Sequence, residues 1–325
     1  MTFSRRKILQ LLAATPLAGA VRPVEAQQSI TAAPAAAAPA KLQVGLVSRH
    51  LQWTTLEDAI DIIAKMGFDA IEWNVRAGGH IEPEHVERDL PRAVELTRKA
   101  GLAVTMITTS IQDAKSPYAE PILQAASGLG IRYYRGGQYF RYDYSRDLAQ
   151  QLEALKPRIA TLVALNEKYK TAVCYHTHSA PGNIGGNIWD LWEVIKGFDP
   201  QVIGLNYDIG HATARNGNGW ADGARIVMPY ILALAIKDVQ WFRDQKGTWR
   251  TEFVPVGEGM IDLKRLFELL KAAQFNGPIN IHIEHDNLLG SDLGTWKLDM
   301  SREQFMAIIT KDLQAVRARM REAQL

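Results

Sequence analysis

The sequence predicts a single (β/α)8 barrel, a closed ring of parallel strands surrounded by helices. Two observations favour this fold. Short apolar segments alternate with helical segments eight times between Leu42 and the C-terminus, and eight strand–helix repeats in about 285 residues are what such a barrel needs. The turn after the first strand, Ser48-Arg49-His50-Leu51, is not rich in glycine, whereas an open sheet that binds a dinucleotide has a glycine-rich turn there.

The first four repeats are assigned from apolar runs and from the signals that end them. Gly67 and Gly101 follow the first two helical stretches, and glycine often ends a helix because it readily adopts the left-handed conformation. The expected strands are Leu42–Ser48, Ala70–Asn74, Ala103–Thr109 and Ile131–Arg135, and the expected helices lie near Thr55–Met66, Glu84–Ala100, Tyr118–Leu129 and Asp147–Tyr169.

The last four repeats show the same alternation of short apolar strands and longer helical stretches, and each strand follows a turn signal. The expected strands are Thr171–His176, Val202–Asp208, Ile231–Lys237 and Pro278–Glu284, and the expected helices are Ile188–Lys196, Ala221–Met228, Leu263–Ala273 and Arg302–Arg319. No second domain is expected, so the barrel is predicted to occupy residues 41–325.

Residues 1–40 have the character of an export signal and a tether. Arg5-Arg6-Lys7 precedes a moderately apolar run, and Val24-Glu25-Ala26 offers a small-residue cleavage site, so residues 1–26 resemble a twin-arginine signal peptide. The apolar run is too short for stable membrane insertion. Residues 27–40 are rich in alanine and proline and are expected to be a disordered linker. We therefore expect a periplasmic protein, with an uncleaved amphipathic tail or anchor as the alternative.

The rest of the chain is close to neutral. Residues 1–26 carry a net +3 of the formal charge of +2, which leaves about −1 for the remainder. That balance gives no electrostatic reason to bind nucleic acid. Cys174 is the only cysteine, so an intrachain disulfide is excluded, and a buried inert thiol is expected in its apolar run. The composition is compatible with a homo-oligomer.

Chemically active side chains gather at the ends of the later strands. The catalytic groups of a barrel stand at the C-terminal ends of its strands and in the loops that follow. Five of the eight histidines fall there, namely His176, His178, His211, His282 and His285. Any one of them alone is more often a hydrogen-bonded structural residue, but a structural purpose would not require this concentration.

The spacing of these residues points to a metal site. Side chains alternate along a strand, so His282 shares a face with Glu284, and His176 with His178. If Asp208 also points into the mouth, two carboxylates and several imidazoles converge. Mixed oxygen and nitrogen donors suit Mn, Co, Fe, Mg or Zn, and a hydroxyl-rich substrate can chelate such an ion. A divalent metal ion is the expected cofactor.

The order of four segments resembles the xylose-isomerase-like superfamily, which contains sugar isomerases and epimerases, inosose dehydratase and endonuclease IV. The segments are Asp208-Ile209-Gly210-His211, Ile236-Lys237-Asp238, Pro255-Val256-Gly257-Glu258-Gly259 and His282-Ile283-Glu284. The resemblance extends from Leu42 to the C-terminus and implies one metal with a ligand from each of strands five to eight. It matches Asp208 and Glu284 to two ligands and His211 to a substrate-facing histidine.

Two positions depart from the family pattern. Strand five carries His176, within Tyr-His-Thr-His, where the family usually has a glutamate, and similar segments occur in the dehydratase-like branch. Strand seven has Ala235 where a histidine ligand is usual. We expect His282 to occupy the space that Ala235 leaves. The predicted metal shell is therefore His176, Asp208, His282 and Glu284, and loss of Asp208 or Glu284 is expected to abolish metal binding.

The resemblance implies that a base removes a proton next to a carbonyl of a carbohydrate. Isomerisation, epimerisation or β-elimination can follow. The missing strand-five glutamate excludes a symmetrical glutamate pair and favours elimination or hydration, as in a 3-keto-glycoside lyase or hydratase. Glu284 or His178 is the expected base, and Lys237 either holds the enolate oxygen or pairs with Asp238. The expected substrate contacts are His211, Arg135, His50 and Trp73.

The expected periplasmic location restricts the class of substrate. Periplasmic pools are poor in sugar phosphates, so an unphosphorylated sugar or keto-sugar is expected. Six tryptophans lie in or near the predicted mouth loops, where their faces can stack on sugar rings: Trp53, Trp73, Trp189, Trp220, Trp241 and Trp249.

Two other protein classes stay open. A non-catalytic sugar-binding barrel is the main alternative, because Ala235 removes a ligand. A DNA-repair nuclease would need more zinc ligands and a basic groove.

Overall fold

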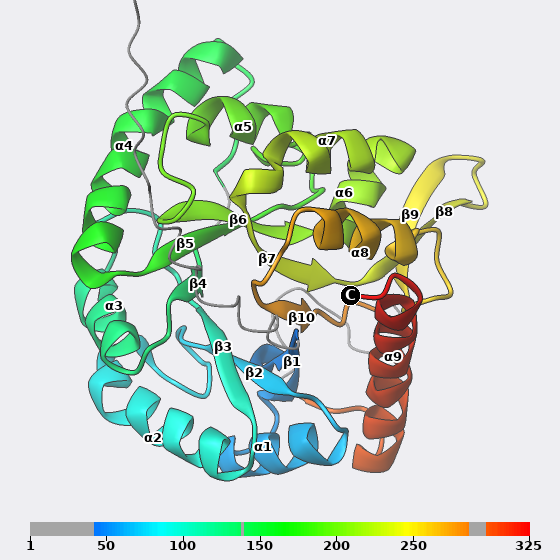
Figure 1. The fold of residues 1–325 in the computed structure, drawn as a ribbon. Helices are drawn as coiled ribbons and strands as arrows, with labels where there is room; N and C mark the ends of the chain where they lie inside the picture. The colour runs from blue at the N-terminus through cyan, green and yellow to red at the C-terminus, as the bar shows by residue number, and fades with distance from the viewer. Residues whose placement is uncertain (1–41, 138–139, 286–296) are drawn as a thin grey trace, which may run out of the picture. The chain divides into compact units, whose positions relative to one another are not determined.

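A computed structural model describes residues 42–137, 140–285 and 297–325. The predicted signal peptide and linker lie outside these residues. Eight parallel strands close into a barrel in the order β1-β10-β7-β6-β5-β4-β3-β2, with helices around the ring (Figure 1). This confirms the predicted (β/α)8 fold. Within the described part of the chain, every helix is too short or too polar to cross a membrane.

The barrel strands lie close to their predicted positions. They are β1 (Val44–Val47), β2 (Ala70–Asn74), β3 (Ala103–Thr108), β4 (Tyr133–Arg135), β5 (Ala172–His176), β6 (Ile203–Asp208), β7 (Ile231–Ile236) and β10 (Ile279–Ile281). The helices are α1 (Leu56–Lys65), α2 (Val86–Lys99), α3 (Ala119–Gly128), α4 (Leu148–Tyr169), α5 (Trp189–Ile195), α6 (Ile209–Asn216), α7 (Trp220–Val227), α8 (Leu263–Ala272) and α9 (Arg302–Glu322).

Local signals in the sequence start several of these helices. The Thr55 side chain accepts a hydrogen bond from the Asp58 N–H at the start of α1, and Asp147 does the same for Gln150 at the start of α4. Ser301 and Gln304 form a reciprocal capping box at the start of α9. Each cap satisfies a backbone donor that the helix itself leaves without a partner.

The inside of the barrel changes from apolar to polar toward its C-terminal mouth. Met106, Cys174 and Ala233 form a buried apolar cluster with Tyr133 and Leu232. Burial raises the pKa of the Cys174 thiol, so the thiol stays protonated and unreactive. Two residues further along the strands the inward positions are polar and almost fully buried, and they include Thr108, His176 and Asn206. The mouth therefore begins with a buried polar layer.

Two elements were not predicted from the sequence. Strands β8 (Asp238–Arg243) and β9 (Trp249–Val254) form an antiparallel hairpin after β7, which stands outside the barrel in Figure 1. Helix α6 begins directly after β6, because the Asp208 side chain accepts the His211 N–H at 2.9 Å and so caps the helix. The segment Asp208–His211 is thus a strand end joined to the first turn of a helix.

Asp238 fixes the return of the hairpin to the barrel. Its buried carboxylate accepts N–H groups from Val239, Gly257, Gly259 and Ile261 at 2.8 to 3.3 Å. A side chain on Gly259 would collide with this carboxylate. Burial raises the pKa of Asp238, and the four backbone donors act against that rise. Lys237 and Asp238 therefore have different partners, because the Asp238 carboxylate turns toward the segment that joins the hairpin to α8.

We expect Asp238→Ala to lower the free energy of unfolding by about 3 kcal/mol, because buried N–H groups lose their acceptor. Urea denaturation of the two proteins measures this difference. Asp222→Ala is a suitable control, since its side chain is 81% exposed, and it should leave the midpoint unchanged. Equal midpoints for Asp238→Ala and the parent chain would contradict the structural role.

Candidate active site

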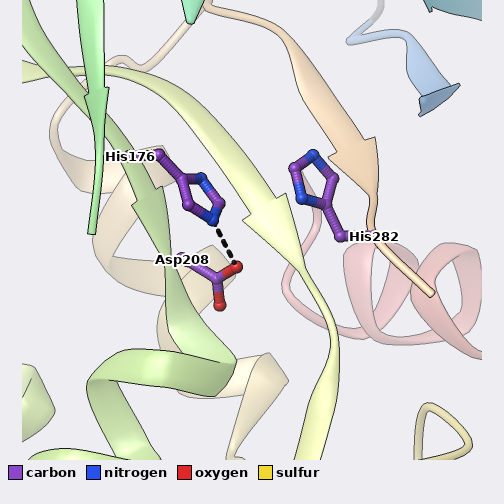
Figure 2. Close-up of side chains that lie close together, drawn as sticks. All are labelled: His176, Asp208 and His282. Atoms are coloured by element: carbon purple, nitrogen blue, oxygen red, sulfur yellow. Dashed lines mark ion pairs between the residues drawn. The ribbon is translucent and has the colours of Figure 1, made fainter. Parts of the chain in front are cut away.

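Three of the four predicted metal ligands converge at the mouth. His176 ends β5, Asp208 ends β6 and His282 directly follows β10, and all three point toward one another in Figure 2. Each offers one ligand atom, and these atoms lie within 4.8 Å of one another. The Nε2 of His176 is 3.4 Å from the Asp208 Oδ2. The group is almost completely buried.

Neighbouring side chains orient both imidazoles. The Nδ1 of His176 lies 3.2 Å from the side-chain amide of Asn206, which turns Nε2 toward Asp208. The Nε2 of His282 lies 3.5 Å from the Glu72 carboxylate, and Glu72 also accepts the Thr108 hydroxyl. Within the described ranges, the buried Nδ1 of His282 has no hydrogen-bond partner. Each ring therefore has one nitrogen held by the barrel and one that can bind an ion.

The electrostatics of the cluster keep both imidazoles neutral. Burial lowers the pKa of His176 well below its usual value, and the nearby charge of Arg135 adds to the effect. Burial also lowers the pKa of His282, although Glu72 opposes this. Burial alone would raise the pKa of Glu72, but the hydrogen bonds from His282 and Thr108 outweigh it, so the Glu72 pKa is lowered. A neutral imidazole beside an ionised carboxylate is the form that binds metals.

The donor set suits a divalent transition metal. Two imidazole nitrogens and one carboxylate oxygen match the preferences of such ions, and a carboxylate behind a ligating histidine is a common support. The His176, Asp208 and His282 cluster could therefore hold a metal ion, with Glu72 orienting His282.

Lys237 forms a second cluster beside the first. It follows β7 and is almost completely buried. Its ammonium lies 2.5 Å from the Glu284 Oε1 and 3.1 Å from the Asp208 Oδ2, and 3.0 Å from the His211 Nε2. A side chain on Gly210 would collide with the Lys237 methylenes, so the glycine at this position makes room for the lysine.

Glu284, the fourth predicted metal ligand, lies beside the three-residue group. Its carboxylate contacts the Lys237 ammonium, whereas His176, Asp208 and His282 form that group, so its role as a ligand stays a prediction. Ala235 pairs in register with Asp208, so no large side chain from β7 stands at that level and the lysine two residues later lies between the two carboxylates. Lys237 contacts the Glu284 and Asp208 carboxylates, and its role in holding an enolate oxygen stays a prediction.

The hydrogen bonds of two histidines define where their protons lie. An ammonium group only donates, so the His211 Nε2 accepts from Lys237, and its Nδ1–H donates to the Ser179 hydroxyl at 3.0 Å. The His178 Nδ1 accepts the Ala180 N–H at 3.0 Å. A neutral His178 therefore carries its proton on Nε2, which makes it a donor. This geometry does not support His178 as the base.

The three other residues predicted to contact substrate are Arg135, His50 and Trp73, and they lie in different surroundings. Arg135 ends β4 and is buried, and its charge acts on both Glu72 and His176. The His50 Nε2 accepts the Ile283 N–H at 2.9 Å, so His50 braces the strand end that carries Glu284. Trp73 does not reach the mouth, because odd-numbered residues of β2 face outward and its indole N–H donates to Thr97 of α2. The expected substrate contact of Trp73 is therefore corrected to helix packing.

Two site residues were not singled out from the sequence. Glu72 lies at an inward position of β2 only two residues from its end, and a buried acidic residue in an apolar strand was the available signal. Phe253 of β9 has its ring 5.2 Å from the His211 ring and 5.0 Å from the Lys237 ammonium. Phe253 could not be found without the hairpin.

Comparisons with known proteins agree with the fold. Residues 60–306 match a family model described as xylose isomerase-like TIM barrel. A comparison with curated proteins finds no match.

Solved structures of several enzymes resemble the chain. A 3-keto-D-glucoside 4-epimerase from E. coli aligns with a TM-score of 0.60 at 16% identity, covering 86% of this chain and 100% of the other. A probable 3-DHS dehydratase from Bacillus anthracis gives 0.62 at 14% identity, covering 85% and 99%. An IOLI protein with a bound zinc atom gives 0.65 at 14% identity, covering 85% and 99%. At these identities the likeness shows the fold.

We expect Asp208→Ala to abolish binding of a divalent transition metal, because the only carboxylate of the three-residue group is lost. Glu284→Gln should keep the metal, because Glu284 lies outside that group. Elemental analysis of the purified proteins after incubation with Mn, Co, Fe or Zn separates the two. Full occupancy in Asp208→Ala, or loss in Glu284→Gln, would contradict this assignment.

Glu72→Gln should weaken metal binding about 10- to 100-fold, because an amide orients His282 less strongly than a carboxylate. Competition with a metal-binding dye gives the affinity. The matched control is Glu57→Gln, on the exposed side of α1. An unchanged affinity in Glu72→Gln would show that His282 does not depend on Glu72.

Proposed function

The chain belongs to the xylose isomerase-like TIM barrel family, and from this we propose that it is a metal-dependent enzyme that removes a proton next to the carbonyl of an unphosphorylated sugar or keto-sugar. The observation that carries the proposal is the pair of adjoining clusters at the mouth. One offers three metal ligands, and the other places a carboxylate 2.5 Å from a buried ammonium. A binding protein would need neither arrangement.

The residues of the second cluster suit the steps of enolisation. When bound, a divalent ion would polarise a carbonyl or two neighbouring hydroxyls. The Glu284 carboxylate is the base that accepts the proton from carbon. The Lys237 ammonium donates a hydrogen bond to the oxygen on which negative charge develops. His211 accepts from Lys237 and so aims the ammonium.

Within this class we propose elimination, or its reverse, hydration. Epimerisation with two glutamate bases needs a second free carboxylate on the opposite side of the substrate, and the Glu72 carboxylate is held by His282 and Thr108. His178, as an Nε2–H donor, is suited to donate a hydrogen bond to a departing oxygen. The similarity to a probable dehydratase as well as to an epimerase is compatible with elimination and with epimerisation.

We propose that the protein is exported to the periplasm by the twin-arginine pathway. Arg5-Arg6 and the apolar run after them support this location. Folded export suits a protein that acquires its metal before transport, and a periplasmic location favours a substrate without phosphate. The non-catalytic sugar-binding barrel remains the second candidate, favoured by Ala235 in place of a ligand.

We expect the metal-loaded protein to exchange deuterium from D2O into the carbon next to the carbonyl of a keto-sugar, or to form an unsaturated product. Methyl 3-keto-glucopyranoside is the first probe, and NMR measures the reaction. Lys237→Met and Glu284→Gln should each lower the rate about 10²- to 10⁴-fold. The control is Lys246→Met, in the exposed hairpin turn.

The result that decides between the two candidate functions is the behaviour of the parent chain. Exchange or elimination that depends on both the added metal and Lys237 supports the enzyme. Sugar binding without either reaction, across 3-keto-glucosides and free ketoses, would favour the binding barrel.

A further inference from the structure

We propose that one face of the β8–β9 hairpin is a binding surface for further sugar units, so that the substrate is an oligosaccharide or a glycoside with a large sugar aglycone. This inference rests on the proposed function, which places the reacting sugar at Lys237. It goes beyond that function because it names the part of the substrate that does not react.

The pairing of the hairpin puts three aromatic rings on one face. Residues directly opposite each other in an antiparallel pair share a face, as do residues two apart on one strand. Val239 pairs with Phe253, Trp241 with Thr251, and Arg243 with Trp249. Phe253, Trp241 and Trp249 therefore follow one another outward on the same face.

The inner end of this face belongs to the candidate active site. Phe253 has its ring 5.0 Å from the Lys237 ammonium and 5.2 Å from the His211 ring. Val239, opposite it, is fully buried. Further out the face is open to solvent, because Trp241 is 42% exposed and Trp249 is 56% exposed. The aromatic face is thus continuous with the site and leads away from it.

The chemistry of the face fits carbohydrate better than a protein partner. Four residues separate Phe253 from Trp249, a span of about 13 Å at the usual strand rise, which is enough for two or three sugar rings. Flat aromatic rings offer apolar faces to the C–H side of a sugar. Thr251 and Arg243 lie between and beside the rings and supply hydroxyl-binding groups, and Arg243 lies 5.1 Å over the Trp249 ring.

Three other tryptophans of the described chain are packed, whereas Trp189 of α5 is 54% exposed. Trp73 donates to Thr97, Trp220 is 3% exposed, and Trp53 packs edge-on against Phe305. On the hairpin, the opposite face carries Phe242, which is half-buried, and the linked pair Gln240 and Glu252. Among the exposed tryptophans of the described residues, Trp241 and Trp249 share the face that continues from Phe253, and Trp189 lies on α5.

The test compares sugars of increasing length on the full metal-loaded chain. The probes are glucose, cellotriose, maltotriose and laminaritriose, with affinities from titration calorimetry. Trp241→Ala and Trp249→Ala should each weaken the preferred trisaccharide about fivefold, and the double variant should weaken it further. Tyr118→Ala, another exposed ring at 46% exposure, is the control and should leave the affinity unchanged.

A second measurement separates this inference from the proposed function. The reaction with methyl 3-keto-glucopyranoside should be unaffected by either tryptophan substitution, whereas KM for the 3-keto trisaccharide should rise. If no reaction occurs with any probe but the trisaccharide preference depends on the two tryptophans, the function fails and the binding surface stands.

Two outcomes would overturn the inference. One is an affinity for all three trisaccharides that is no higher than for glucose, or that does not change in the double variant. The other is a dimer in light scattering that dissociates in the Trp241→Ala, Trp249→Ala double variant, because the face would then be covered by a second copy of the chain.

Discussion

The ammonium of Lys237 between two buried carboxylates is the interaction on which the site depends. A lone charge in a barrel interior would be strongly unfavourable, and removing one partner leaves the others without compensation. Asp208, Glu284 and His211 together match the three N–H donors of this lysine. Asp208 also faces His176, so this one carboxylate joins the base cluster to the candidate metal cluster. Neither cluster can change its charge without affecting the other.

The polar layer explains why these residues can stand so close together. Several buried groups in it face partners of complementary kind, such as Glu72 with Thr108 and His282, whereas the Nδ1 of His282 has no hydrogen-bond partner within the described residues. Beneath it, the apolar cluster of Met106, Cys174 and Ala233 fills the barrel. Satisfied polar groups in a low-dielectric interior strengthen one another and hold a single geometry. The polar groups of the mouth are therefore held in place by their neighbours in the barrel.

The fold could be predicted because the repeat of strand and helix is a local property, visible in apolar runs and glycine stops. The candidate metal ligands His176, Asp208 and His282 could be predicted because they stand at strand ends. The partner of Glu284 could not be predicted, because it depends on how far the Lys237 side chain extends past Ala235 and Gly210. Glu72 was missed because the sequence of β2 does not predict which neighbouring side chain its carboxylate contacts. The β8–β9 hairpin lies between the seventh barrel strand and its helix, where no element was expected, although Asp244 and Gly247 form its turn.

The hairpin also has a consequence for how such a protein can diversify. Its two strands pair only with each other, and Asp238 secures their root to the barrel independently of their length. Adding or removing two residues from each strand would keep every remaining side chain on its face. The reach of the aromatic face can thus vary in steps of two cross-strand pairs while the barrel stays the same. On the proposed function, preference for longer or shorter sugars could change in evolution through the hairpin alone, with the barrel mouth unaltered.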